Sequence, residues 1–291
     1  MFRNVIVGVD FHDGAYDAAA LAAALAPEAG AGVELVGAYP NPLLPFPLVL
    51  GSGADARERA EGRLSDVRHD CIPHASRQAI ADNSPARALR HVAEREHADL
   101  IVLGSEHRAE HDRAAAGRTG RQVVHGAPCA VAIAAAGIRH DPRMEQIVVG
   151  LDGSPESDGG VATAHALSRA LGSRLDVVVV VDDRVPMVLA PTGIRVEAAR
   201  RAEMVGAEHA RAKELLERTL AERERAIGEV RVGDPAEELI EAGRDADLLV
   251  LGSRHWGPLD RLLIGSTSEE LLRDAPCSLL LVPRPPEARQ G

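Results

Sequence analysis

The sequence ADLIVLGS at residues 98–105 recurs almost unchanged as ADLLVLGS at residues 246–253. Two further pairs repeat in the same order, VIVGVD (5–10) with IVVGLD (147–152) and APCAV (127–131) with APCSL (275–279). A tandem duplication of a unit of about 140 residues, a length that suits one domain, explains all three pairs. We therefore predict two domains, residues 1–139 and 144–291, with a linker in the stretch 135–144.

Each copy alternates apolar runs with segments of helical period. The predicted strands are 4–9, 33–38, 70–74, 99–103 and 129–134 in the first copy, and 146–151, 175–181, 229–232, 247–251 and 277–282 in the second. Runs of Val and Leu without polar alternation are typical of parallel strands covered on both faces. With helices between them and right-handed crossovers, the pattern predicts an α/β fold of two tandem, doubly wound, five-stranded, Rossmann-like sheets related by a pseudo-twofold axis.

The predicted helices are 15–25, 54–67, 83–89 and 118–125 in the first copy, and 160–171, 195–225, 233–239 and 266–273 in the second. Asn83 or Ser84, and Asp234, are the expected N-caps of the third helix in each copy, because a proline follows in the first turn. The final strands 129–134 and 277–282 would be exposed apolar edges, so we predict that they pair with each other within the chain.

Composition narrows the partners and the compartment. The formal net charge of the 291-residue chain is −11 without a basic tail, which argues against nucleic acid as a partner. The sequence contains no uncharged apolar run long enough to be expected to span a membrane. Three widely spaced cysteines in no metal-binding pattern are expected to be reduced thiols of a cytoplasmic protein. Lys213 is the only lysine, so any phosphate site lacks the lysine of a Walker A loop.

Two glycines recur 13 residues apart after the fourth predicted strand, Gly104 with Gly117 and Gly252 with Gly265. Glycines let backbone amides approach a phosphate closely, and the hydroxyls of Ser266 and Thr267 add donors at a helix start. We therefore predict an anion-binding site in the second copy.

Asp10 and Asp152 end the first strand of each copy, at the same sheet edge. A carboxylate there can accept hydrogen bonds from ribose hydroxyls, as acidic residues do in dinucleotide-binding folds. The alternative for Asp152, followed by Gly153 and Ser154, is a turn that opens the next helix.

On these motifs the chain resembles a tandem universal stress protein over essentially its whole length. The resemblance implies ATP or another adenine nucleotide, with Mg²⁺ as a possible companion, phosphates on the glycine loop and ribose on the aspartate. Adenine is then expected near Val180, or near Ala38 in the first copy. In the second copy Arg254, His255 and Gly257 would belong to the loop.

The chain departs from the family's GxxG motif in both copies. His107 and His255 stand at the second glycine. In the first copy Arg118 and Thr119 follow Gly117, where the signature has Ser or Thr directly after the glycine. Either Arg118 pairs with phosphate or the first site is disabled and kept for structure, so ligand binding is expected mainly in the second copy. No metal site is expected.

No nucleophile with an adjacent base is legible, so no dedicated catalysis is expected, although slow ATP hydrolysis stays open. Two functions remain in view: an ATP-binding regulatory protein of the stress response, and a nucleotide-free module that binds a protein partner of unknown identity. The apolar, proline-rich segments 40–50 and 185–193 are either lids over the sites, or ordinary packed loops or surfaces for a partner.

Overall fold

The computed structural model describes residues 2–26, 30–41, 53–106, 109–184, 198–253, 255–256, 262–263 and 265–283. The strands of the first half are β1 (Asn4–Gly8), β2 (Gly32–Tyr39), β3 (Ser76–Ala81), β4 (Leu100–Gly104) and β5 (Ala130–Ala134). Those of the second half are β6 (Gln146–Gly150), β7 (Arg174–Asp182), β8 (Ala226–Gly233), β9 (Leu248–Gly252) and β12 (Ser278–Val282). A separate antiparallel ribbon joins β10 (His255–Trp256) to β11 (Leu262–Leu263).

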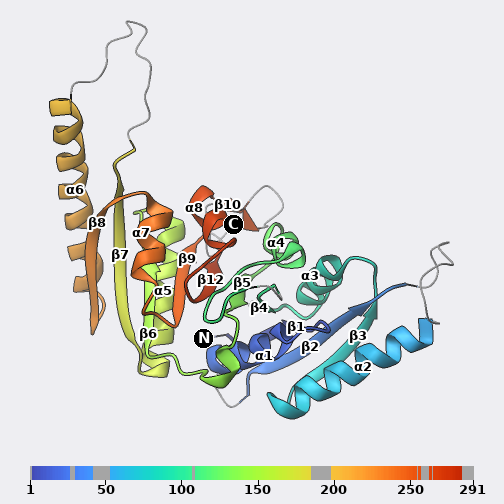
Figure 1. Ribbon diagram of the computed structural model, residues 1–291. Helices are drawn as coiled ribbons and strands as arrows, with labels where there is room; N and C mark the ends of the chain where they lie inside the picture. The colour runs from blue at the N-terminus through green and yellow to red at the C-terminus, as the bar shows by residue number, and fades with distance from the viewer. Residues whose placement is uncertain are drawn as a thin grey trace, which may run out of the picture.

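The ten main strands form one sheet in the order β3-β2-β1-β4-β5-β12-β9-β6-β7-β8 (Figure 1). Neighbours within each half are parallel, and β5 and β12 meet antiparallel at the centre. The register places Leu280 opposite Ala132, and both side chains are fully buried. The predicted pairing of the two final strands within one chain is therefore confirmed.

Helices cover both faces of the sheet. One buried cluster holds residues of α1 (Gly14–Leu25), α2 (Gly53–Asp70), α5 (Pro155–Leu171) and α6 (Ala198–Ala221). A second cluster holds residues of α3 (Pro85–Arg95), α4 (Arg118–Val124), α7 (Pro235–Ala242) and α8 (Ser266–Leu271). Because each cluster contains residues of both halves, the apolar core runs across the central strand pair.

The predicted caps of the third helices are present. Ser84 Oγ accepts a hydrogen bond from the amide of Arg87 at 3.4 Å, and Pro85 opens α3. Asp234 Oδ1 accepts from the amides of Ala236 and Glu237 at 2.8 and 3.2 Å, ahead of α7. These bonds satisfy amides that a helix start otherwise leaves without partners.

The third strand of the first half was predicted in the wrong place. Residues 70–74 end α2 and turn, with the amide of Cys71 bonded to Val67 O, and β3 follows at Ser76–Ala81. This edge strand has the polar sequence SRQAIA, so hydrophobic pattern marks it poorly. Several helices are also longer than predicted: α2 spans Gly53–Asp70, α3 ends at Arg95, and α5 begins at Pro155.

The predicted linker is held by a buried carboxylate of α1. Asp17 is 4% exposed and accepts hydrogen bonds from the amides of Gly137 and Arg139 at 3.0 and 3.2 Å. Residues Ile138–His140 form a short 3₁₀ turn there. The connection between the halves is thus part of the first half's core. Among the helices that the structure describes, none is both long and apolar enough to cross a membrane.

The segment 109–116 of the first half contacts the second half. Ala114 and Ala275 exchange backbone hydrogen bonds of 3.0 and 2.8 Å, and the amide of Ala116 donates to Leu272 O at 2.8 Å. The guanidinium of Arg113 pairs with Asp274. In the first half, therefore, the stretch between the two repeated glycines also serves as an interface between the halves.

Candidate functional site

The strand order places a crevice at the same point in each half. After β1 the chain moves outward to β2, and after β4 it moves in the opposite direction to β5, so the loops after β1 and β4 diverge. The same reversal occurs between β6 and β9. In open α/β sheets, ligands bind at the carboxyl ends of the strands that flank such a switch point.

A cavity of about 240 Å³ lies at the switch point of the second half. Six of the predicted site residues line it: Asp152, Ser154, Val180, Gly252, Gly265 and Thr267. Apolar side chains of Leu151, Val178, Leu239 and Leu251 form further walls. An apolar crevice with a few polar groups at its mouth is the usual form of a small-molecule site.

Asp152 shapes a turn as well as lining the cavity. Its Oδ1 accepts hydrogen bonds from the amide and the hydroxyl of Ser154, at 2.9 and 2.5 Å. Ser154 Oγ in turn accepts from the amide of Ser157 and caps α5. Gly153 has φ of 78°, a conformation that favours glycine. The turn predicted as an alternative role for Asp152 is thus present beside its position in the cavity wall.

The first half repeats this arrangement in a cavity of about 250 Å³. Its walls include all six predicted residues of this half that the structure describes: Asp10, Ala38, Gly104, Gly117, Arg118 and Thr119. Asp10 Oδ1 accepts from the amide of His12 at 2.9 Å, which is the same turn as in the second half. Whether this cavity is disabled stays a prediction, since its size matches that of the second.

The repeated strand-end glycines are required by helix packing. A Cβ at Gly252 would lie 2.2 Å from the carbonyl oxygen of Glu156, in the first turn of α5. A Cβ at Gly104 would lie 2.1 Å from the carbonyl oxygen of Gly14 in α1. Such distances are far inside van der Waals contact. From the sequence, these glycines were expected to let backbone amides approach a phosphate. Close contact between helix and strand already explains why glycine is needed at both positions.

Several predicted residues lie elsewhere. Ser266 is exposed at the start of α8 and is not part of the cavity wall, and Gly153 faces Leu215 of α6. His255 is in the β10–β11 ribbon, where it pairs with Leu263. The remaining predictions fall outside the described residues, namely His107, Arg254, Gly257 and most of the two proline-rich segments 40–50 and 185–193.

The repeat itself could have identified cavity residues that were missed. Pro85 and Leu89 line the first cavity, and Pro235 and Leu239 occupy the equivalent places in the second. Both pairs are 150 residues apart, so a matched comparison of the copies finds them. Glu106, which lines only the first cavity, has no matching acidic residue in the second copy and gave no such signal.

Asp182 borders the second cavity where β7 ends. Arg184 binds it through Nε at 3.1 Å and Nη2 at 3.2 Å and also pairs with Asp234, the cap of α7. The hydrogen bond from Arg184 lowers the pKa of Asp182 below its ordinary value. This carboxylate therefore stays charged near neutral pH, with its oxygens directed to the arginine.

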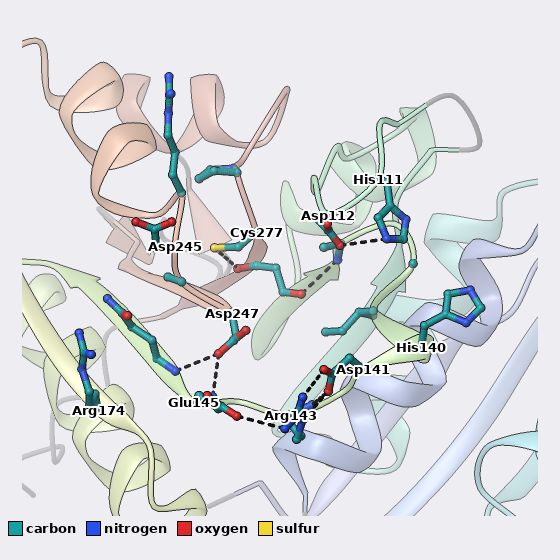
Figure 2. A pocket seen from close by; sticks show the side chains of 18 residues that line it. His111, Asp112, His140, Asp141, Arg143, Glu145, Arg174, Asp245, Asp247 and Cys277 are labelled. Carbon is teal, nitrogen blue, oxygen red and sulfur yellow. Dashed lines mark hydrogen bonds and ion pairs between the residues drawn. The ribbon is translucent and has the colours of Figure 1, made fainter.

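A larger hollow of about 660 Å³ lies between the halves (Figure 2). Arg143 in this hollow is held by Asp141 at 2.6 Å and by Glu145 at 3.3 Å. Asp247 accepts the amide hydrogens of Glu145 and Gln146 at 2.7 and 2.9 Å. Because these charges are engaged with each other and with backbone, the hollow offers a nucleotide less than the two smaller cavities do.

The comparisons with known proteins agree with this fold. The model of the universal stress protein family matches residues 1–135 and 144–283. The chain therefore belongs to the universal stress protein family, as two tandem copies.

A universal stress protein of Thermus aquaticus is 37% identical over 141 residues, which are 48% of this chain and 98% of that protein. One from Mycobacterium tuberculosis is 32% identical over 190 residues, 61% of this chain and 59% of its own length. The crystal structure of a universal stress protein from Archaeoglobus fulgidus superimposes with a TM-score of 0.68 at 17% identity, covering 98% of this chain and 97% of the other. That likeness shows the fold.

Proposed function

We propose that this chain is a regulatory protein of the stress response that binds ATP in the cavity of its second half and has no dedicated catalytic activity. One observation carries the proposal. At the topological switch point, an apolar crevice lies next to a carboxylate that follows the first strand of the domain. The same arrangement occurs in both halves, which favours a retained binding framework over a chance hollow.

The chemistry of the second cavity suits the nucleoside end of ATP. Val178 and Val180 offer apolar surface for a base, and Asp152 lies exposed at the mouth, where it can accept hydrogen bonds from a ribose. At about 240 Å³ the cavity is smaller than the range of about 300–1,000 Å³ that is usual for ligand sites. The triphosphate would therefore extend past Gly265 and Thr267 toward solvent.

The absence of dedicated catalysis is part of the proposal. Ser154 Oγ, a hydroxyl of the cavity wall, is already engaged with Asp152 and with the amide of Ser157. If Mg²⁺ accompanies ATP, the phosphates would be its main ligands, because the described His, Cys, Asp and Glu side chains form no cluster of three suited to a metal. The three free thiols suit a reducing compartment, and we propose a cytoplasmic location.

Calorimetry with ATP tests the proposal on the full chain and on Gly265→Glu. The added carboxylate would lie in the cavity wall and repel phosphate, so this variant should lose ATP binding in the second half. Gly62→Glu is the matched control, because Gly62 is exposed on α2 and no atom lies within 4 Å of the point where a Cβ would be added. Absence of ATP binding by the unaltered chain would refute the proposal.

The same variant separates the two functions that the sequence left in view. An ATP-dependent regulator should lose its contribution to stress survival in cells that carry Gly265→Glu. A nucleotide-free interaction module should keep that contribution, because the outer surfaces of the sheet and helices are unchanged.

A further inference from the structure

The first-half cavity has one carboxylate, that of Glu106, with no acidic counterpart in the second copy. Glu106 lines the first cavity, two residues after the end of β4, and its side chain is exposed. Its carboxylate has no hydrogen bond or ion pair to any residue that the structure describes. The repeat places Arg254 at the equivalent position of the second half, 148 residues later. The two copies therefore carry opposite charges at this point in the sequence.

Glu106 lies next to the part of the cavity wall where the family's glycine motif would place the phosphates. A Cβ at Gly117 would lie 3.3 Å from Cβ of Glu106 and 3.9 Å from its Oε2. Gly117 is the residue directly before α4, and Arg118 and Thr119 continue the same wall. A phosphate bound beside Gly117 would therefore have to lie close to a second anion.

The backbone holds Glu106 in this place. Its amide donates to Ala115 O and its carbonyl oxygen accepts from the amide of Ala109, both at 2.9 Å. The amide of Ala115 is bound by Ser105 Oγ at 3.0 Å, and the amide of Ala116 by the second half through Leu272 O. The loop is thus fixed at both ends and is poorly able to carry the carboxylate away from a ligand.

The cavity wall offers little positive charge to offset the carboxylate of Glu106. Arg118 is exposed, while Asp10 adds a second carboxylate at the carboxyl end of β1. A phosphate that is ionised near neutral pH offers only acceptors to Glu106, whereas the 5′-hydroxyl of a nucleoside offers a donor. A carboxylate accepts hydrogen bonds and repels anions, so it discriminates between these two ligands.

We propose that the first-half cavity binds a nucleoside without phosphates, and that Glu106 is the residue that excludes nucleotides from it. This inference rests on the proposed function, because it takes the nucleoside framework of the second cavity as its starting point. One chain then holds two sites of different ligand class, one for ATP and one for the uncharged nucleoside.

Calorimetry on the full chain tests the inference with adenosine and ATP as probes. The unaltered chain should bind one equivalent of ATP, and once saturated with ATP it should bind one further equivalent of adenosine. Glu106→Gln keeps the shape and removes the charge, so it should bind a second equivalent of ATP. Glu106→Arg, which copies the charge of the second half, should bind that second equivalent at least about tenfold more tightly than Glu106→Gln does. Circular dichroism checks that both variants are folded.

Glu110→Gln is the matched control, because Glu110 is an exposed residue of the same segment outside the cavity wall. It should leave both counts unchanged. Two equal ATP sites in the unaltered chain, no adenosine binding to the ATP-saturated chain, or an unchanged ATP count in both Glu106 variants would each overturn the inference. Failure of the proposed function looks different: Gly265→Glu would then bind ATP as the unaltered chain does, or the unaltered chain would bind none, while adenosine still binds.

Discussion

The imidazole Nε2 of His125 lies 2.7 Å from the carboxylate Oε1 of Glu269. His125 is the C-cap directly after α4, and Glu269 lies in the first turn of α8, so this contact joins the end of the last helix of one half to the last helix of the other. Both helices also border cavities, α4 through Arg118 and Thr119 and α8 through Thr267. The two candidate sites are thus connected through side chains as well as through the central strand pair.

This contact should contribute little to stability. The side chains of His125 and Glu269 are 49% and 31% exposed, so water screens their attraction. We expect a double-mutant cycle of His125→Ala and Glu269→Ala to give a coupling free energy below about 1 kcal/mol. Urea denaturation measures it. A much larger coupling would mean that the pair, and not the buried strand contact, holds the halves together.

Gly252→Ala should destabilise the chain. The new methyl would meet the carbonyl oxygen of Glu156 at 2.2 Å and the amide nitrogen of Ser157 at 2.7 Å, so α5 would have to move away from β9. We expect the free energy of unfolding to fall by about 1–3 kcal/mol or more, the usual cost of overpacking.

Gly206→Ala in α6 is the control, because no atom lies within 4 Å of a Cβ there. Helix propensity predicts a gain of about 0.5–1 kcal/mol for this variant. Chemical denaturation compares the two proteins. Equal or greater stability of Gly252→Ala would show that the contact between helix and strand is not tight.

Thiol labelling should separate the three cysteines. Burial raises the pKa of both Cys129 and Cys277 to about 12, so almost no reactive thiolate is present at mildly alkaline pH. Cys71 is only half-buried, and burial followed by the charge of Asp70 raises its pKa. We expect slow labelling of Cys71 in the folded chain and labelling of the other two after unfolding. Cys71→Ser should abolish the folded-state reaction, and rapid reaction of two thiols would contradict the buried positions.

Acid should weaken the fold partly through Asp82. Arg87 binds both oxygens of this carboxylate, at 2.6 and 2.9 Å, and the hydrogen bond lowers the pKa of Asp82. Because the pKa of Asp82 is lower in the folded state, the ionised carboxylate stabilises the fold at pH values above its ordinary pKa of 3.8. The protein loses this stabilisation as the pH falls through the folded-state pKa. The urea midpoint should therefore drop more steeply in this acid range for the unaltered chain than for Asp82→Asn. Identical slopes would show that the pair does not contribute.

The central strands of the fold could be predicted from sequence alone because they are continuous hydrophobic runs. The repeated ADLIVLGS and ADLLVLGS segments form β4 and β9 beside the switch points, and their apolar residues are buried on both faces. The edge strand β3 was misplaced because an edge strand has one solvent-facing side and a mixed sequence. Pattern therefore predicts central strands better than outer ones.

The sequence predicted most of the residues that line the candidate site, but only part of the physical reason why each residue is there. The aspartates after β1 and β6, and the residues expected near adenine, Val180 and Ala38, line the cavities where the repeat placed them. The reason for Gly104 and Gly252 required coordinates, because a clash with a helix carbonyl oxygen is a contact between elements distant in sequence. Glu106 required them too, since only its distance from Gly117 reveals what it opposes.

The antiparallel pairing of β5 with β12 occurs inside a single polypeptide. A dimer of identical single modules must carry every substitution twice, so its two crevices cannot diverge. Covalent fusion removes that constraint and fixes the proportion of the two crevices at one to one in every molecule. One crevice is then free to change while the other is retained, which is the condition that the proposed pair of sites with different ligands requires.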